Sequence, residues 1–382
     1  MDIHLMDITL RDGEQAVGVI FSRWEKLQIA SHLAQMGIPS LEAGFPALGP
    51  EEKDAVRSIV NAHLQVGNRQ TPLEVYAFAR ARREDVADAA ECGVHGVVIS
   101  ISTSDIHIER KFRKTRAWVL ERMEEAVDEA RQHGLSFIVS AEDASRSNLD
   151  FLTEYYRRAE ALGARMVRYC DSLGVNDPFT TYQHIRHIRR AVSIPIQLHM
   201  HNEFGMATAN VLVGLRAGAR AVAASLGGLG ERTGNSPLEE VVMALKHLYG
   251  VDLGVDTTHF REAAEYIAEA SQRAIPVWKA IIGSSIFAHE SGIHADGILK
   301  HPHTYEAFSP EEVNLQRQIV IGKHSGTHAL IHKFSTEFGI QLDGETASRL
   351  LERVRAAAVE LKRPLFDKEL MLLYRAVAGH TG

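Results

Sequence analysis

The sequence predicts an α/β protein: a (β/α)8 (TIM) barrel over residues 1–276, followed by a mainly helical region over residues 277–382. Short apolar runs of strand length recur through the first two thirds of the chain, and stretches of helical period separate most of them. Many of these helices end at a glycine just before the next run, which is typical of helix C-caps. Eight strand–helix units in about 250 residues favour a closed barrel over an open doubly wound sheet.

The barrel strands are expected in the eight apolar runs, namely residues 3–7, 40–43, 74–79, 96–101, 135–140, 166–170, 196–200 and 221–224. Residues 115–132 and 149–162 are amphipathic with helical period and predict two of the intervening helices. The expected C-cap glycines are Gly37, Gly93, Gly134, Gly163 and Gly218. A doubly wound sheet fits the same alternation, but no glycine-rich dinucleotide turn follows the first strand.

Composition limits the classes of function. The formal net charge of −7 argues against nucleic acid as the main partner, although it does not exclude a small anionic substrate. The two cysteines, Cys92 and Cys170, are too few for a disulfide framework and indicate a reducing, cytoplasmic environment. There is no charged-then-apolar leader and no apolar run of about 18 residues, so we expect neither secretion nor a membrane span.

A metal site is predicted at the end of the seventh strand. His199 and His201 lie two residues apart, so on a strand both imidazoles project from one face, about 7 Å apart at Cα. In this fold the C-terminal ends of the strands carry the chemistry. Two neutral imidazoles with one carboxylate leave coordination positions open for substrate and water. Asp12, in the charged loop after strand one, is our choice for the carboxylate, and Asn235 is either a weaker fourth ligand or a stabiliser of its glycine-rich turn.

Arg11 adjoins the predicted metal ligand Asp12. Such an arginine can be only the salt-bridge partner of the aspartate. The functional interpretation is a hydrogen bond from Arg11 to a substrate carbonyl oxygen on which negative charge develops.

Four motifs, taken together and in order, resemble the isopropylmalate synthase/homocitrate synthase family. They are DITLRDGEQ at 7–15, HMHN at 199–202, GLGERTGN at 228–235 and ESGIHADG at 290–297. The resemblance extends from the first strand to about GKHSG at 322–326.

This resemblance implies a metal-dependent barrel that condenses acetyl-CoA with a 2-oxo acid, which the metal chelates through its carbonyl and carboxylate oxygens. It implies Asp12, His199 and His201 as ligands of Mg²⁺, Mn²⁺ or Zn²⁺, with Arg11 on the carbonyl. Glu142, His294 and Tyr305 match the acid/base group of the family, and the C-terminal region would place His294 over the barrel of a partner subunit. A homodimer is therefore expected. Tyr305 could alternatively be an aromatic residue at the surface with no role in the reaction.

The identity of the 2-oxo acid depends on other residues. Arg168 ends a strand near the predicted site and suits the second carboxylate of 2-oxoglutarate, unless it pairs with a neighbouring acid. The run EDASR at 142–146 and a length that leaves no room for a further regulatory domain resemble homocitrate synthases of the nitrogen-fixation type. Ile138 stands where the lysine-pathway enzymes carry an arginine, which disfavours that subtype. The expected substrate-binding set is Arg11, Gln15, Arg80, His107, Ser140 and Arg168.

Several alternatives stay open. EAGFP at 42–46 and TSDIH at 103–107 resemble isopropylmalate synthases instead. Citramalate synthase is a further alternative. Another is a homologue of a phosphonate pathway, such as 2-phosphonomethylmalate synthase, because Arg80, His107, Lys111 and Arg113 offer positive charge for a phosphonate substrate. A metal-dependent lyase that cleaves a carbon–carbon bond on the same barrel is a more distant alternative.

Overall fold

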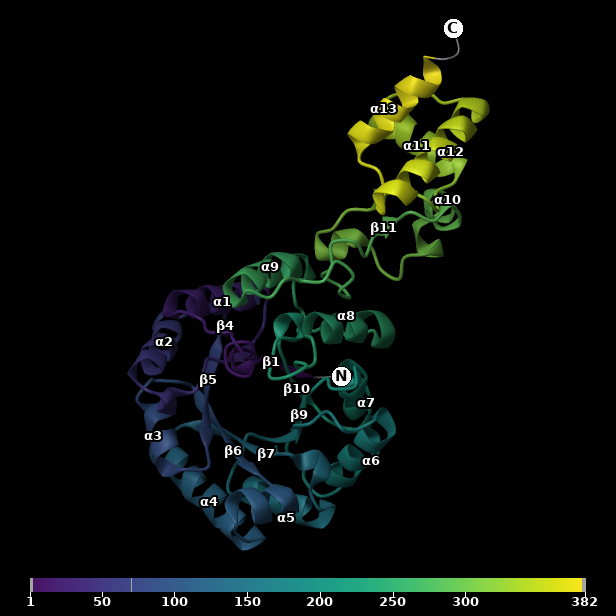
Figure 1. Cartoon of the computed structure of the whole chain (residues 1–382). Coiled ribbons are helices and arrows are strands. Elements are labelled where there is room, and N and C mark those ends of the chain that lie inside the picture. Colours follow the sequence, from purple (N-terminus) through teal and green to yellow (C-terminus); the bar gives the residue numbers. More distant parts are fainter. Residues whose placement is uncertain (1–2, 70, 380–382) are drawn as a thin grey trace. The chain divides into compact units, whose positions relative to one another are not determined.

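The first part of the chain forms the expected closed barrel. The computed structural model describes residues 3–69 and 71–379 (Figure 1). Eight parallel strands follow one another around the barrel in the order β1-β10-β9-β8-β7-β6-β5-β2, and β2 pairs again with β1. The open, doubly wound alternative is therefore excluded.

All eight predicted runs are strands, with shifts of a residue or two at their ends. The barrel strands are β1 His4–Asp7, β2 Ser40–Glu42, β5 Glu74–Arg80, β6 Gly96–Ser102, β7 Ser136–Glu142, β8 Met166–Asp171, β9 Ile196–Met200 and β10 Ala221–Ala224. A short antiparallel pair, β3 Gln65–Val66 and β4 Thr71–Pro72, precedes β5. Several strands run further toward their C-terminal ends than the sequence indicates, which keeps Arg80, Ser102 and Glu142 within regular strands.

Helices surround the barrel in Figure 1; the first seven connect its successive strands, and the last two follow β10. They are α1 Arg23–Gln35, α2 Pro50–Asn61, α3 Arg83–Ala90, α4 Arg116–Gln132, α5 Leu149–Ala161, α6 Pro178–Arg189, α7 Ala207–Ala217, α8 Leu238–Tyr249 and α9 Phe260–Ser271. The side chains of Thr115 and Asn148 accept backbone hydrogen bonds at the starts of α4 and α5. Each of the five glycines predicted as C-caps has a positive φ, between 67° and 120°.

The lower barrel interior is apolar and supports a polar upper layer. Met6, Tyr76, Val98, Ile138, Met166 and Ala221 form one buried cluster. Ile138, where an arginine would mark the lysine-pathway subtype, thus belongs to this apolar layer. Because inward-facing residues alternate along a strand, Ser140 and Arg168 lie one layer above Ile138 and Met166. The polar residues gather at the C-terminal ends of the strands.

The second unit begins at Pro276, where the first unit ends at Ile275. It contains α10 Gly292–Lys300, α11 Thr327–Glu337, α12 Gly344–Leu361 and α13 Asp367–Ala378, with a two-stranded sheet of β11 Ala288–His289 and β12 Gln318–Ile319. Helices α11, α12 and α13 share a separate core that includes Leu330, Phe334, Leu350, Val354 and Leu370. In neither unit is a described helix both long and apolar enough to span a membrane.

Candidate active site

The two histidines of the seventh barrel strand face each other at the barrel mouth. His199 lies on β9 and His201 follows it directly, and their Nε2 atoms are 3.1 Å apart. Both rings are almost fully buried. Burial lowers the pKa of both imidazoles below the ordinary value and outweighs the nearby Asp12 carboxylate, so both rings are neutral at pH 7.

Asp12 reaches the same point from the loop after β1. The side chain of Asp7 organises this loop by accepting hydrogen bonds from the Thr9 backbone N–H (2.8 Å) and Thr9 hydroxyl (2.9 Å). Burial alone would raise the pKa of Asp12, but the adjacent Arg11 guanidinium and the hydrogen bond from Asn235 hold it well below its ordinary value. The site therefore combines one carboxylate with two neutral imidazoles.

Asn235 comes from the glycine-rich loop after β10. Its Nδ2 donates to Asp12 Oδ2 at 2.6 Å and to the Leu229 carbonyl at 3.0 Å. Gly234 has φ +92°, and a Cβ there would lie 2.1 Å from the carbonyl oxygen of Gly228. Only glycine therefore permits this loop path. With this amide orientation, Asn235 holds the Asp12 carboxylate in place, and its own buried Oδ1 has no hydrogen-bond partner among the described residues.

This donor set fits a divalent cation. Asp12, His199 and His201 each offer one ligand atom, and all three atoms lie within 4.8 Å of one another. Two nitrogen ligands at about 2.0–2.1 Å from one metal are about 2.9–3.4 Å apart, which matches the separation of the two Nε2 atoms. The two Nε2 atoms contact each other, and the Nδ1 atoms are buried without a hydrogen-bond partner among the described residues, so no hydrogen bond from another described residue holds these ring nitrogens.

A buried triad of charged side chains lies beside the candidate metal ligands Asp12, His199 and His201. Glu42, at the end of β2, accepts a hydrogen bond from Arg11 Nε at 2.7 Å on one oxygen, and its other oxygen forms an ion pair with Arg168 Nη2 at 2.5 Å. Glu42 is fully buried. Burial raises its pKa, but the two guanidinium groups offset this effect and hold the pKa below its ordinary value. The carboxylate is therefore ionised and orients both arginines.

Arg11 is bound on two sides. Its Nη1 donates to Asp12 Oδ1 at 2.8 Å and to Gln15 Oε1 at 3.3 Å, and its guanidinium lies over the Phe78 ring at 4.8 Å. These bonds and the one to Glu42 use Nε and Nη1. Among the described residues Nη2 makes no hydrogen bond, so it remains available to a substrate oxygen.

From the sequence, Arg168 either binds the second carboxylate of 2-oxoglutarate or pairs with a neighbouring acid, and its contacts favour the second interpretation. It lies within β8, is 1% exposed, and donates to Gln197 Oε1 at 2.7 Å in addition to its pair with Glu42. A neighbouring acid therefore already neutralises it. The sequence motifs give no role to Glu42 or Gln197. The detectable signal was a charged residue at the end of an otherwise apolar barrel strand.

Glu142 ends β7 at the rim of the barrel. Lys111 Nζ lies 2.9 Å from its carboxylate, and His107 Nδ1 lies 3.6 Å from the same oxygen. Both residues belong to a single π-helical turn, η4 His107–Phe112, in the loop after β6. Such turns occur often at functional sites. The structure thus brings His107 to Glu142, although not to the metal cluster.

Three other expected residues lie at different positions around the barrel mouth. Ser140 is buried in the barrel, and its hydroxyl lies 3.3 Å from Cys170 Sγ. Arg80 ends β5, but its guanidinium is bound by Asp85 at 2.6 Å and 2.9 Å. The remaining residue, Gln15, contacts Arg11 as described above.

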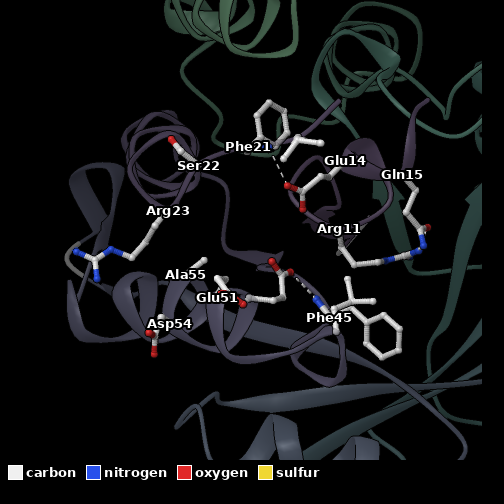
Figure 2. Close-up of a pocket in the computed structure, with 13 residues that line it drawn as sticks. Arg11, Glu14, Gln15, Phe21, Ser22, Arg23, Phe45, Glu51, Asp54 and Ala55 are labelled. Atoms are coloured by element: carbon white, nitrogen blue, oxygen red, sulfur yellow. Dashed lines mark hydrogen bonds between the residues drawn. The ribbon is translucent and has the colours of Figure 1, made fainter. Parts of the chain in front are cut away.

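A pocket of about 790 Å³ adjoins Arg11 and Gln15. It lies within the first unit, and Figure 2 shows Arg11, Gln15 and Phe45 at the right, Arg23 at the left and Phe21 at the top between them. A substrate that contacts Arg11 therefore has an open approach from this side.

His294 and Tyr305 lie in the second unit. His294 is on α10, and its ring centroid is 4.3 Å from that of Tyr305. The tyrosine is 45% exposed. The two rings are therefore neighbours within their own unit.

Comparison with known proteins agrees with this architecture. The HMGL-like family profile matches residues 2–267, and the profile described as "Homocitrate synthase post-HMGL domain-like" matches residues 281–362. Hydroxymethylglutaryl-CoA lyase from Pseudomonas aeruginosa superposes with a TM-score of 0.63 at 21% identity, covering 72% of this chain and 94% of that one. This structural likeness supports the fold alone.

Curated relatives match nearly the whole chain. The protein is 54% identical to 2-isopropylmalate synthase 2 of Caldanaerobacter subterraneus, over 98% of this chain and 96% of that protein. It is 44% identical to homocitrate synthase 1 of Nostoc sp., over 97% and 96% respectively. These matches confirm the resemblance seen in the sequence motifs, and the chain belongs to the isopropylmalate synthase/homocitrate synthase family.

Proposed function

We propose that this protein is an acyltransferase that condenses acetyl-CoA with a 2-oxo acid and releases CoA. The observation that carries the proposal is the convergence of Asp12, His199 and His201 beside Arg11 at the C-terminal mouth of the barrel. Asp12, His199 and His201 would hold a divalent cation and would leave coordination positions open for a 2-oxo acid. When bound, the Mg²⁺, Mn²⁺ or Zn²⁺ ion polarises the keto carbonyl.

Arg11 completes the recognition of the keto oxygen. Its free Nη2 donates a hydrogen bond to this oxygen, which becomes an alkoxide when the carbon–carbon bond forms. Glu42 fixes the guanidinium through Nε, and Asp12 and Gln15 fix it through Nη1. A donor that is already oriented toward developing charge needs no reorganisation during the reaction.

The proton transfers are assigned to Glu142, His294 and Tyr305. One group of this set removes a proton from the acetyl methyl, and the resulting enolate attacks the keto carbon. Proton donation to the alkoxide follows, and water then cleaves the thioester to a carboxylate and the CoA thiol. We assign His294 and Tyr305 to the site of a partner subunit in a homodimer, with residues 277–382 as the subdomain that supplies them, as the motif resemblance implies. The profile match over residues 281–362 supports the presence of such a subdomain.

The 2-oxo acid favoured by Arg168 in the sequence is 2-oxoglutarate, which would give homocitrate as the product. Support for this assignment comes from the relatives named homocitrate synthase, at 44% and 42% identity. The side chains of Lys111 and His107 at the rim of the barrel are further candidate partners for the distal carboxylate.

A second candidate is 2-oxoisovalerate, which would give 2-isopropylmalate. The specific observation in its favour is the pair between Arg168 and Glu42, because a neutralised arginine adds little for a second carboxylate. The relative at 54% identity carries the matching name.

A thiol-release assay with acetyl-CoA tests both levels of the proposal. The panel contains 2-oxoglutarate, 2-oxoisovalerate, pyruvate, oxaloacetate and phosphonopyruvate, each with and without divalent metal. We expect thiol release only when metal and a 2-oxo acid are both present, and the highest kcat/KM identifies the substrate. Release that does not depend on any 2-oxo acid, combined with cleavage of 3-hydroxy-3-methylglutaryl-CoA, would instead identify a lyase.

A further inference from the structure

The loop between β6 and α4 carries an unusual concentration of positive charge. Residues 110–116, which we call the basic turn, read RKFRKTR and contain five cations and no acid. The chain as a whole has a formal net charge of −7. A compact positive patch on an acidic protein attracts an anionic ligand to that one place.

Two of the five cations already have carboxylate partners. Arg116 binds Asp105 through two hydrogen bonds of 2.8 Å and 2.7 Å, and Lys111 binds Glu142 at 2.9 Å. The remaining three, Arg110, Arg113 and Lys114, are exposed. In the described parts of the chain, none of these three forms an ion pair. Three cations of the basic turn are therefore free to bind an anion.

Aromatic rings lie among these cations. The centroids of Phe112 and Trp118 are 5.4 Å apart, and both side chains are partly exposed. Lys114 Nζ lies 5.9 Å from the Trp118 ring and Lys111 Nζ lies 5.3 Å from the Phe112 ring. Cations beside exposed aromatic rings match a ligand that combines phosphate groups with a flat base, because the base stacks and the phosphates pair.

The basic turn adjoins the proposed acid/base group. Lys111 belongs to the turn and contacts Glu142 directly, so the turn and the carboxylate lie at the same part of the barrel rim. The Cα of Lys114 is three residues further on, at most about 11 Å from that of Lys111. A ligand bound at the turn by its anionic end can therefore extend its other end to Glu142.

We propose that the basic turn binds the 3′-phosphoadenosine diphosphate end of acetyl-CoA, with Arg113 and Lys114 on the phosphates and Phe112 and Trp118 beside the adenine. The thioester then extends to Glu142. This inference rests on the proposed function, because it assumes that acetyl-CoA is the acyl donor. It adds the residues that hold the nucleotide.

The test uses the full-length double variant Arg113→Asn/Lys114→Gln. Arg113 has φ +55°, a left-handed conformation that asparagine tolerates better than most residues. The matched control, Arg186→Gln/Arg190→Gln, removes two exposed cations at the C-terminal end of α6. Because barrel helices run antiparallel to the strands, this end lies away from the C-terminal ends of the strands. Neither variant changes a candidate metal ligand, Arg11 or a residue of the proposed acid/base group.

Steady-state kinetics are measured with acetyl-CoA and with acetyl-pantetheine, which lacks the nucleotide. We expect the KM for acetyl-CoA to rise about five- to tenfold in the variant, with kcat and the KM for the 2-oxo acid unchanged. The KM for acetyl-pantetheine should be the same in wild type, variant and control. The effect on acetyl-CoA should also shrink at high salt.

The outcomes separate this inference from the proposed function. If the wild type turns over acetyl-CoA but the variant and control have the same KM for it, the basic turn does not hold the nucleotide, and the proposed function stands. An equal rise for acetyl-CoA and acetyl-pantetheine would also overturn the inference, because the loop would then act on the acyl end. If the wild type releases no thiol with any 2-oxo acid, the proposed function itself fails.

Discussion

The buried triad of Arg11, Glu42 and Arg168 leads to a specific prediction about stability. Glu42→Gln keeps the size of the side chain but removes the charge that balances two buried guanidinium groups. The substitution breaks the 2.7 Å ion pair to Arg11 and the 2.5 Å ion pair to Arg168. Removing one partner of a buried ion pair costs about 3–5 kcal/mol, because the remaining charge stays buried without compensation.

We therefore expect Glu42→Gln to lower the free energy of unfolding by about 3–5 kcal/mol. For a unit of this size that corresponds to a fall in Tm of roughly 6–20 °C. Urea unfolding followed by circular dichroism measures the difference. Glu91→Gln is the matched control, because Glu91 pairs with Lys53 at 2.8 Å but its side chain is 59% exposed. That surface pair contributes about 0–1 kcal/mol.

The pH dependence gives a second check on the same residue. The pKa of Glu42 is held below its ordinary value, so its stabilising effect is complete above about pH 4.5 and is lost as pH falls through the lowered pKa. The stability difference between wild type and Glu42→Gln should thus be constant above pH 5 and shrink in more acidic solution. A loss below about 1 kcal/mol at pH 7 would refute the reasoning that Glu42 holds two charged arginines.

Four further predictions follow from the site. His201→Ala should abolish metal-dependent thiol release with little change in the far-ultraviolet circular dichroism spectrum; retained activity would remove His201 from the ligand set. Chelation should abolish activity and lower Tm, with both restored by Mg²⁺, Mn²⁺ or Zn²⁺, because a cation that binds only the folded state stabilises it. Burial raises the pKa of Asp7 to about 7, although the hydrogen bonds from Thr9 act in the opposite direction, so the folded state binds this proton more tightly than the unfolded state. The free energy of unfolding of the wild type, relative to that of Asp7→Asn, should therefore fall by up to about 4 kcal/mol as pH rises from about 4 to about 7. Parallel curves of stability against pH for the two proteins would contradict this. Arg168→Leu should raise the KM for 2-oxoglutarate far more than that for acetyl-CoA if Arg168 holds the distal carboxylate; equal effects on both, together with lost stability, would show that it serves only Glu42.

The barrel was predictable because its signals are local. Each strand is a short apolar run and each helix has its own period, and the glycines at positions such as Gly37 and Gly163 end helices with a positive φ that other residues disfavour. The convergence of Asp12, His199 and His201 was predictable for a similar reason. The His199/His201 spacing determines the shared face, and the fold places Asp12 at the same end of the barrel.

The partners of the charged residues could not be predicted from sequence. Glu42 and Arg168 are 126 positions apart, and their contact depends on how strands β2 and β8 meet across the barrel interior. Arg80 illustrates the same limit, because Asp85 in the following helix engages its guanidinium. Charges recognised one at a time indicate a polar site, but only the packed barrel shows which of them are already neutralised.

The most direct test of the central claim is the fate of the acetyl methyl carbon. The protein is incubated with acetyl-CoA labelled with ¹³C at the methyl group, divalent metal and the preferred 2-oxo acid, and the product is analysed by NMR spectroscopy. We predict that the label becomes a CH₂ group bonded to the former keto carbon, in an amount equal to the CoA released. Labelled free acetate together with unchanged 2-oxo acid would contradict the account, because no carbon–carbon bond would have formed.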